Sequence, residues 1–163
     1  MNKSIIIYES LHGSTEKCAK LLGELIRSDM QFARLQDTDE INLEEYETVI
    51  IGGSIHHGLI QTRIEKFMQE NQDKLLEKNL GLYLCCMEEG ETARQQFDKA
   101  FNHELREKAI AKGLFGGEFN LRKMSFFEKK LTKKLTGVTT SVSKINTEEI
   151  GAFAEKMNKL MNK

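Results

Sequence analysis

The fold of this chain is decided near its N-terminus by the stretch Ser4-Ile5-Ile6-Ile7-Tyr8-Glu9-Ser10-Leu11-His12-Gly13-Ser14-Thr15. Its first five residues form a short, continuous and largely β-branched apolar run, which is typical of a strand covered on both faces. The segment that follows contains hydroxyls and a glycine, and it leads directly into Glu16–Ile26, where apolar residues recur on one helical face. A buried strand followed at once by an amphipathic helix indicates a βαβ unit and therefore a parallel sheet.

The same alternation of apolar runs and amphipathic stretches continues to the end of the chain. Helices between parallel strands cross over in the right-handed sense and so cover both faces of the sheet. The sequence therefore predicts an α/β fold, a three-layer sandwich, with residues 1–163 as a single domain. The further elements predicted are an edge strand over Met30–Leu35, a buried strand over Thr48–Ile51 ended by Gly52 and Gly53, a helix from Ile64 to Leu75, a strand over Leu80–Met87, a helical stretch over Thr92–Lys108, a last strand over Leu114–Phe119 and a closing helix over Thr147–Leu160.

The composition is that of an ordinary globular protein, with 39% hydrophobic and 30% charged residues. Basic and acidic residues nearly balance, 24 against 25, and a net charge of −1 argues against general nucleic-acid binding. The apolar runs are only strand-sized, and Glu9 interrupts the first one too early for a secretion signal. The three cysteines have no metal-ligand spacing and are interpreted as reduced thiols, which indicates a cytoplasmic protein.

Ligands of an open α/β sheet bind at the carboxyl ends of its strands, so the loops after the predicted strands are the candidate sites. After the first strand, Ser10–Thr15 place three hydroxyls and a glycine at the start of a helix, where free N–H groups and the helix dipole favour an anion. The loop has no Lys or Arg, which separates it from a Walker-type loop and suits a phosphate that is held rather than transferred. A Ser or Thr N-cap without a ligand is the alternative, and the residues alone do not decide between the two.

Two further loops carry weaker signals. The glycines and imidazoles of Gly52–Gly58 offer a close backbone approach and a flat, partly apolar wall, with an ordinary glycine turn as the alternative. The loop Cys86–Thr92 carries three carboxylates, which would repel a second phosphate. The loop could still lie along the edge of an uncharged heterocycle. Solvated charges at a helix start are the alternative for these carboxylates, above all for Glu91.

Taken together, the motif Ser10-x-x-Gly13-x-Thr15 and the loop Ile51-Gly52-Gly53-Ser54-Ile55-His56-His57-Gly58 resemble those of the flavodoxin family. They resemble still more closely the flavodoxin-like menaquinone-dependent protoporphyrinogen dehydrogenases, which also have a glycine pair, here Gly116-Gly117, before a basic aromatic insertion. The resemblance covers nearly the whole chain. It implies a five-stranded parallel sheet of order 2-1-3-4-5, an order that commonly binds FMN at its switch point, and FMN as the cofactor.

The resemblance implies that each of the three loops contacts a different part of FMN. The phosphate would be held by Ser10, Leu11, His12, Gly13, Ser14 and Thr15, the flavin ring bordered by Gly53, Ser54, Ile55, His56, His57 and Gly58, and its pyrimidine edge placed along Cys86, Met87 and Glu88. The chain has no Trp and its third loop has no Tyr, so His57 is the stacking partner that remains. We therefore expect weaker FMN binding than in a standard flavodoxin, and we assign no catalytic residue and no metal ligand.

A basic segment is inserted at about residues 120–140, before the closing helix. Between Leu121 and Gly137 six basic residues stand against one acidic residue, a net charge of +5, and apolar residues recur at Phe127, Leu131 and Leu135. This pattern predicts a basic helix over 122–135 that lies on an anionic membrane surface, covers a docking site, or packs as a solvated helix on the sheet edge. The expected localisation is cytoplasmic, with peripheral contact at the inner face of the membrane left open.

Two functions compete for these residues. The first is an FMN-dependent oxidoreductase of the protoporphyrinogen dehydrogenase type that passes electrons from its substrate through FMN to a quinone. The second is a flavodoxin-type one-electron carrier between protein partners, and the basic segment favours the enzyme because a carrier flavodoxin is expected to be acidic. A fold without flavin is the third possibility. The Cys-x5-Arg phosphatase pattern fails, however, because the residues six positions after the cysteines are Glu24, Glu91 and Thr92. The phospho-receiver pattern fails because its acidic cluster and Lys are missing.

Overall fold

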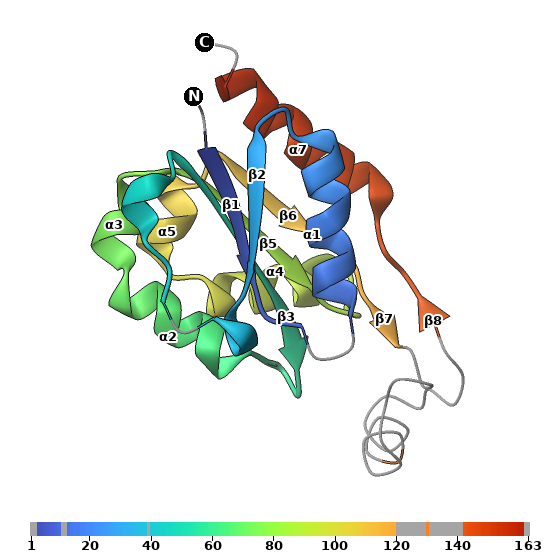
Figure 1. The fold of residues 1–163 in the computed structure, drawn as a ribbon. Helices are drawn as coiled ribbons and strands as arrows, with labels where there is room; N and C mark the ends of the chain where they lie inside the picture. The colour runs from blue at the N-terminus through green and yellow to red at the C-terminus, as the bar shows by residue number, and fades with distance from the viewer. Residues whose placement is uncertain (1–2, 11–12, 39, 120–129, 131–141, 162–163) are drawn as a thin grey trace.

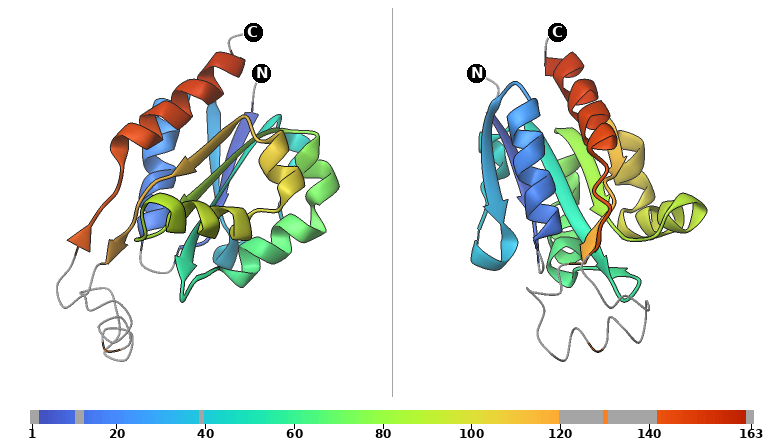
Figure 2. Two further views of the ribbon diagram at one scale, coloured as in Figure 1. Left: turned by 180° about the vertical axis from the view of Figure 1, so that it is seen from behind. Right: turned by 90° about the vertical axis from the view of Figure 1, so that its right-hand side faces the viewer.

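The computed structural model describes residues 3–10, 13–38, 40–119, 130 and 142–161. Its central sheet has helices packed on both faces (Figures 1 and 2), which confirms the predicted three-layer α/β sandwich. Five parallel strands of the described chain lie in the order β2-β1-β3-β5-β6, and β4 pairs antiparallel with β3. Counted in chain order, the parallel strands follow the expected order 2-1-3-4-5. The strands span β1 (Lys3–Tyr8), β2 (Asp29–Arg34), β3 (Thr48–His56), β4 (Leu59–Ile60), β5 (Asn79–Cys85) and β6 (Ala111–Leu114).

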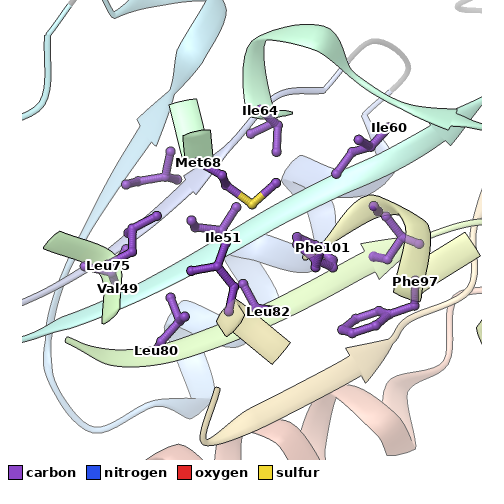
Figure 3. Packing of buried hydrophobic residues seen from close by; sticks show 14 of the residues in the cluster. Val49, Ile51, Ile60, Ile64, Met68, Leu75, Leu80, Leu82, Phe97 and Phe101 are labelled. Atoms are coloured by element: carbon purple, nitrogen blue, oxygen red, sulfur yellow. The ribbon is translucent and has the colours of Figure 1, made fainter. Parts of the chain in front are cut away.

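The two helical layers are separated by the alternation of side chains along each buried strand. In β1, Ile5 and Ile7 pack under one helical layer, whereas Ile6 and Tyr8 pack under the other. Figure 3 shows the first of these cores, in which Met68 lies close to Ile51. One layer consists of α1 (Ser14–Leu25) and α7 (Thr147–Met161). The other contains α2 (Thr62–Glu70), α3 (Gln72–Leu76), α4 (Gly90–Ala100) and α5 (His103–Lys108). The connection from β2 to β3 contains the 3-10 turns η1 (Leu35–Asp37) and η2 (Leu43–Glu45).

The prediction that Gly52 and Gly53 end the third strand is wrong. β3 runs on to His56 and turns back as β4 in a short hairpin, with Ile55 opposite Ile60. The two glycines are packing positions inside the strand, because a Cβ at Gly52 would overlap the ring of Tyr83 and one at Gly53 would overlap Ile60. A glycine pair in a sequence suggests a turn, but here the side chains of neighbouring residues occupy the space that the Cβ atoms would have taken.

The last predicted strand is displaced. β6 covers residues 111–114, and the chain leaves the sheet at Phe115 and Gly116, where a φ of +76° at Gly116 redirects the backbone. The segment beyond forms β7 (Glu118–Phe119), which pairs antiparallel with β8 (Val142–Ser143). Figure 1 places this pair beyond the sheet, on the side where α1 begins. The predicted strand Leu114–Phe119 therefore combines the end of β6 with a separate two-stranded ribbon.

The stretches 64–75 and 92–108 were each predicted as one helix, and each contains two short helices, α2 and α3 in the first and α4 and α5 in the second. Residues 92–108 are divided between α4 and α5 because Phe101 turns into the core and the Asn102 side chain accepts a hydrogen bond from the Leu105 amide, at 2.9 Å. No helix in the described part of the chain is long and apolar enough to cross a membrane. The predicted basic helix over 122–135 lies outside the described residues, apart from the exposed Lys130.

Candidate functional site

The loop after β1 meets α1 in an arrangement that leaves the helix start without a side-chain cap. Gly13 occupies the N-cap position with a φ of +94°, and its amide donates to Ser10 Oγ at 3.0 Å. Because glycine has no side chain, the amides of the first helical turn find no capping acceptor on this residue. The N-cap residue is therefore not a Ser or Thr, and no side chain among the described residues caps the amides of the first turn, an arrangement that suits an anion. Leu11 and His12 lie outside the described residues.

Unpaired polar atoms gather around this loop. Six buried side-chain oxygen and nitrogen atoms of the described residues have no hydrogen-bond partner, and four of them lie on residues that flank the carboxyl ends of β1 and β2. These four are Glu9 Oε2, Thr15 Oγ1, Arg34 Nε and Gln36 Oε1. Thr15 itself is only 1% exposed, and its hydroxyl lies beside the Cys85 thiol, where it acts to lower the pKa of that thiol against the larger effects of Cys18 and burial. Since buried polar groups in folded proteins are nearly always paired, their concentration at one loop points to a polar ligand there.

Two residues that the sequence did not indicate support the loop, Arg34 at the end of β2 and Gln36 in the following turn η1. Gln36 Nε2 donates to the Ser10 carbonyl at 2.7 Å, and Arg34 Nη2 donates to the same oxygen at 3.4 Å. The loop has no cation of its own, but the tertiary structure brings the Arg34 guanidinium to its edge. No local sequence signal could reveal this contact, because it depends on the parallel pairing of β1 with β2.

The second loop is held to the first by Gln61, another residue that sequence reasoning missed. Its amide oxygen accepts from the Ser54 backbone N–H at 2.8 Å, and its Nε2 donates to Ser54 Oγ at 2.6 Å and to the Glu9 carbonyl at 2.9 Å. Ser54 Oγ also lies 3.1 Å from His56 Nε2. The end of β1 and the hairpin after β3 are thus joined by one side chain.

The tip of this hairpin is open to solvent. His57 and Gly58 both have positive φ, +53° and +81°. His57 is exposed, and Leu59 beside it is 55% exposed. An exposed imidazole next to an exposed apolar side chain can border a flat ring, whereas Ser54 is buried beneath the hairpin.

The third loop, with the predicted residues Cys86, Met87 and Glu88, packs against the glycine pair after β6. The Cys86 amide donates to the Gly116 carbonyl at 2.9 Å, and Gly117 lies against the Met87 sulfur. A cavity of about 680 Å³ opens beside this loop, between α4, β6 and the start of α7. No described residue of the first two loops lines that cavity, so it belongs to the third loop and its neighbours.

The cysteines are buried and free. Cys18 and Cys85 lie in the same core with their sulfur atoms 3.7 Å apart, and the Cys86 thiol donates to the Glu88 carbonyl at 3.7 Å. No cluster of three or more His, Cys, Asp or Glu side chains suited to a metal ion occurs among the described residues.

Burial of these thiols predicts a loss of stability at alkaline pH. Burial raises the pKa of Cys86 from about 9 to about 11, and the hydrogen bond to Cys18 together with burial raises the pKa of Cys85. The folded chain therefore holds protons that the unfolded chain releases, so the free energy of unfolding should fall as the pH rises from about 9 towards 11. Urea unfolding at pH 8 and at pH 10.5 measures this fall, and a Cys86→Ala variant should show a smaller one. An equal fall in that variant would contradict the assignment to Cys86.

The sequence matches a family model described as a flavodoxin domain over residues 5–146. No curated protein matches the chain. A short-chain flavodoxin associated with a non-canonical PDU bacterial microcompartment is 13% identical, with 98% of this chain and 99% of that chain covered and a TM-score of 0.63. Two-electron reduced flavodoxin from Megasphaera elsdenii is 16% identical, with 96% of this chain and 98% of that chain covered and a TM-score of 0.60. Oxidised flavodoxin 1 from Bacillus cereus is 18% identical, with 97% of this chain and 98% of that chain covered and a TM-score of 0.59. At these identities the structural likeness shows the fold.

Proposed function

This chain belongs to the flavodoxin domain family, and from that premise we propose that it is a redox protein that binds FMN at the carboxyl ends of β1, β3 and β5. Flavodoxins bind FMN, a cofactor that, when bound, supplies one- or two-electron exchange at its ring. The observation that carries the proposal is the start of α1, where the N-cap is a glycine and no described side chain caps the first-turn amides, as a phosphate site requires. The exposed His57 would lie beside the ring, and the loop Cys86–Glu88 along its edge.

Titration of the purified protein with FMN tests the proposal. We expect a one-to-one complex, detected by quenching of flavin fluorescence, and weaker binding of riboflavin, which has the same ring but no phosphate. Because phosphate binding at a helix start uses several charge-assisted hydrogen bonds, FMN should bind about 100-fold more tightly than riboflavin. A chain that binds neither flavin at high concentration is not an FMN protein, and the proposal then fails.

The narrower proposal is that the chain is an oxidoreductase of the protoporphyrinogen dehydrogenase type with a quinone as acceptor. It is supported by the loop Ser54–Gly58, by the glycine pair Gly116-Gly117 packed on the third loop, and by the basic insertion that follows. Photoreduction of the FMN complex distinguishes this enzyme from a one-electron carrier. Uptake of electrons in pairs, together with oxidation of added protoporphyrinogen, supports the enzyme, and stable uptake of single electrons supports the carrier.

We also propose that the segment 122–135 contacts an anionic membrane surface, since its net charge and apolar spacing suit a lipid interface. Sedimentation with vesicles that contain anionic lipid tests this contact. Binding that disappears when Lys129, Lys130, Lys133 and Lys134 are replaced by Gln supports it, and equal binding to neutral vesicles contradicts it.

A further inference from the structure

The strand β2 is an open edge of the main sheet. All of its residues pair in register with β1, from Asp29 opposite Lys3 to Arg34 opposite Tyr8, and within the described chain it pairs with no other strand. The right-hand view of Figure 2 shows β2 at the margin of the sheet. The strand therefore presents a row of backbone N–H and C=O groups that can pair with a further strand.

The usual protections of an edge strand are missing from β2. The chain contains no proline, and β2 has no lysine. Its register with β1 is continuous and has no bulge that would twist the edge away. The opposite edge of the sheet, β6, differs because it has only four residues and carries the exposed Lys112. Of the two edges, β2 is therefore the one that is suited to a contact.

Phe32 supplies this edge with a fixed apolar side chain. It is 47% exposed, and its ring packs against Gly23 of α1, where a Cβ would lie only 2.4 Å from the ring atom Cζ. A glycine inside a helix lowers the stability of that helix, and here it makes room for a ring that still remains half-exposed. The half-buried Met30 lies on the same face of the strand, two residues away. Fixed, half-exposed aromatic side chains of this kind are typical of protein interfaces.

The charges at the two ends of β2 favour a second copy of this chain as the partner. Asp29 begins the strand and Arg34 ends it. Antiparallel pairing of two copies brings the acidic end of one strand beside the basic end of the other, whereas parallel pairing would bring like charges together. The net charge of the chain is only −1, so the association of two copies meets little overall repulsion.

We propose that this chain forms a symmetric dimer through antiparallel pairing of β2 with β2 of a second copy. With Gln31 on the two-fold axis, each Phe32 lies opposite Met30 of the other copy, a favourable contact between sulfur and an aromatic ring. Each Arg34 then lies opposite Ser28, so no like charges face each other. The two sheets become one continuous sheet whose carboxyl ends point in opposite directions in the two halves. Both candidate FMN sites therefore stay open.

Sedimentation velocity of the flavin-free protein tests the proposal. We expect a dimer with a Kd of about 10 μM, as for other small interfaces. Phe32→Lys should raise this Kd by about 100-fold, because it places a solvated charge at the apolar centre of the contact. Leu25→Lys is the matched control and should leave the Kd unchanged, since Leu25 is also 47% exposed but lies in α1. Asp29→Arg should weaken the dimer most at low salt, because it brings like charges together.

Other results overturn the proposal. A wild type that stays monomeric at about 1 mM does not pair through this edge. If Phe32→Lys leaves the dimer intact, or if Leu25→Lys dissociates it as strongly, the interface lies elsewhere. Assemblies larger than a dimer also contradict it, because a two-fold contact between these edges closes on itself. Circular dichroism checks that each variant is folded, and Asp29→Arg carries the test if Phe32→Lys does not fold, since Asp29 is exposed. The measurement needs no flavin, so its outcome is independent of the proposed FMN site.

Discussion

A Gly52→Ala variant should lose about 3 kcal/mol of stability or fail to fold, because the core leaves no room for one methyl group. An added Cβ would overlap the Cζ, Oη and Cε1 atoms of Tyr83. Tyr83 is fully buried, stacks on Phe115 with ring centroids 4.8 Å apart, and donates its hydroxyl to the Thr15 carbonyl at 2.9 Å. The ring is thus fixed on several sides. Moving it would disturb the first turn of α1, so any folded variant should also bind FMN less tightly.

Urea unfolding followed by circular dichroism measures this loss, and a single transition is expected if residues 1–163 form one domain. Gly151→Ala is the matched control, since a Cβ at that position of α7 meets nothing within 4 Å. Replacing a helical glycine by alanine there should stabilise the protein by about 0.5–1 kcal/mol. The same chemical change should therefore have opposite signs at the two positions. A Gly52→Ala variant as stable as the wild type would show that Tyr83 is not held as tightly as its contacts indicate.

A Ser14→Asp variant should lose FMN binding by about 100-fold while its fold is as stable as the wild type or slightly more so. Ser14 is the first residue of α1 and is only half-buried. A carboxylate at a helix start interacts favourably with the helix dipole, by about 0.3–1 kcal/mol. The same carboxylate would repel a bound phosphate by about 2–3 kcal/mol at the effective dielectric of a protein surface. Stability and phosphate binding should thus change in opposite directions.

Riboflavin and a neutral variant complete this test. Riboflavin carries no phosphate, so its affinity should be nearly unchanged in Ser14→Asp. Ser14→Asn has nearly the shape of Ser14→Asp without its charge, and it should retain FMN binding within about threefold. Isothermal titration of Ser14→Asp and of Ser14→Asn with FMN and with riboflavin gives the four affinities to compare. Equal losses of FMN and riboflavin in Ser14→Asp would show that the flavin phosphate does not lie at the start of α1.

Much of the sheet was predictable because buried parallel strands carry a local signal. The apolar runs in β1, at Thr48–Ile51 and at Leu80–Cys85, the first two of them rich in β-branched residues, mark strands whose two faces are both covered. The helix starts after these strands followed from the change of apolar spacing from 2 to 3.6 residues.

The errors arose where long-range contacts determine the local structure. β3 continues through Gly52 and Gly53 because Tyr83 and Ile60 occupy the space of their missing side chains. The chain leaves β6 before Gly116 because that residue packs directly against the Lys144 backbone, far along the sequence. These neighbours cannot be identified from residues nearby in the chain, so Gly52 and Gly53 resembled an ordinary turn and Gly116 was placed inside a strand.

The sequence by itself determined the parallel α/β fold and the place of the candidate site, because periodicity and strand composition depend on near neighbours. The tertiary structure alone decided which side chains border that site. Arg34, Gln36 and Gln61 reach Ser10, Ser54 and Glu9 only because β1 lies between β2 and β3 in the sheet. Strand order brings together residues that are 24 to 52 positions apart in the chain. Hydrogen bonds between such residues depend on folded geometry and leave no periodic signal in the sequence.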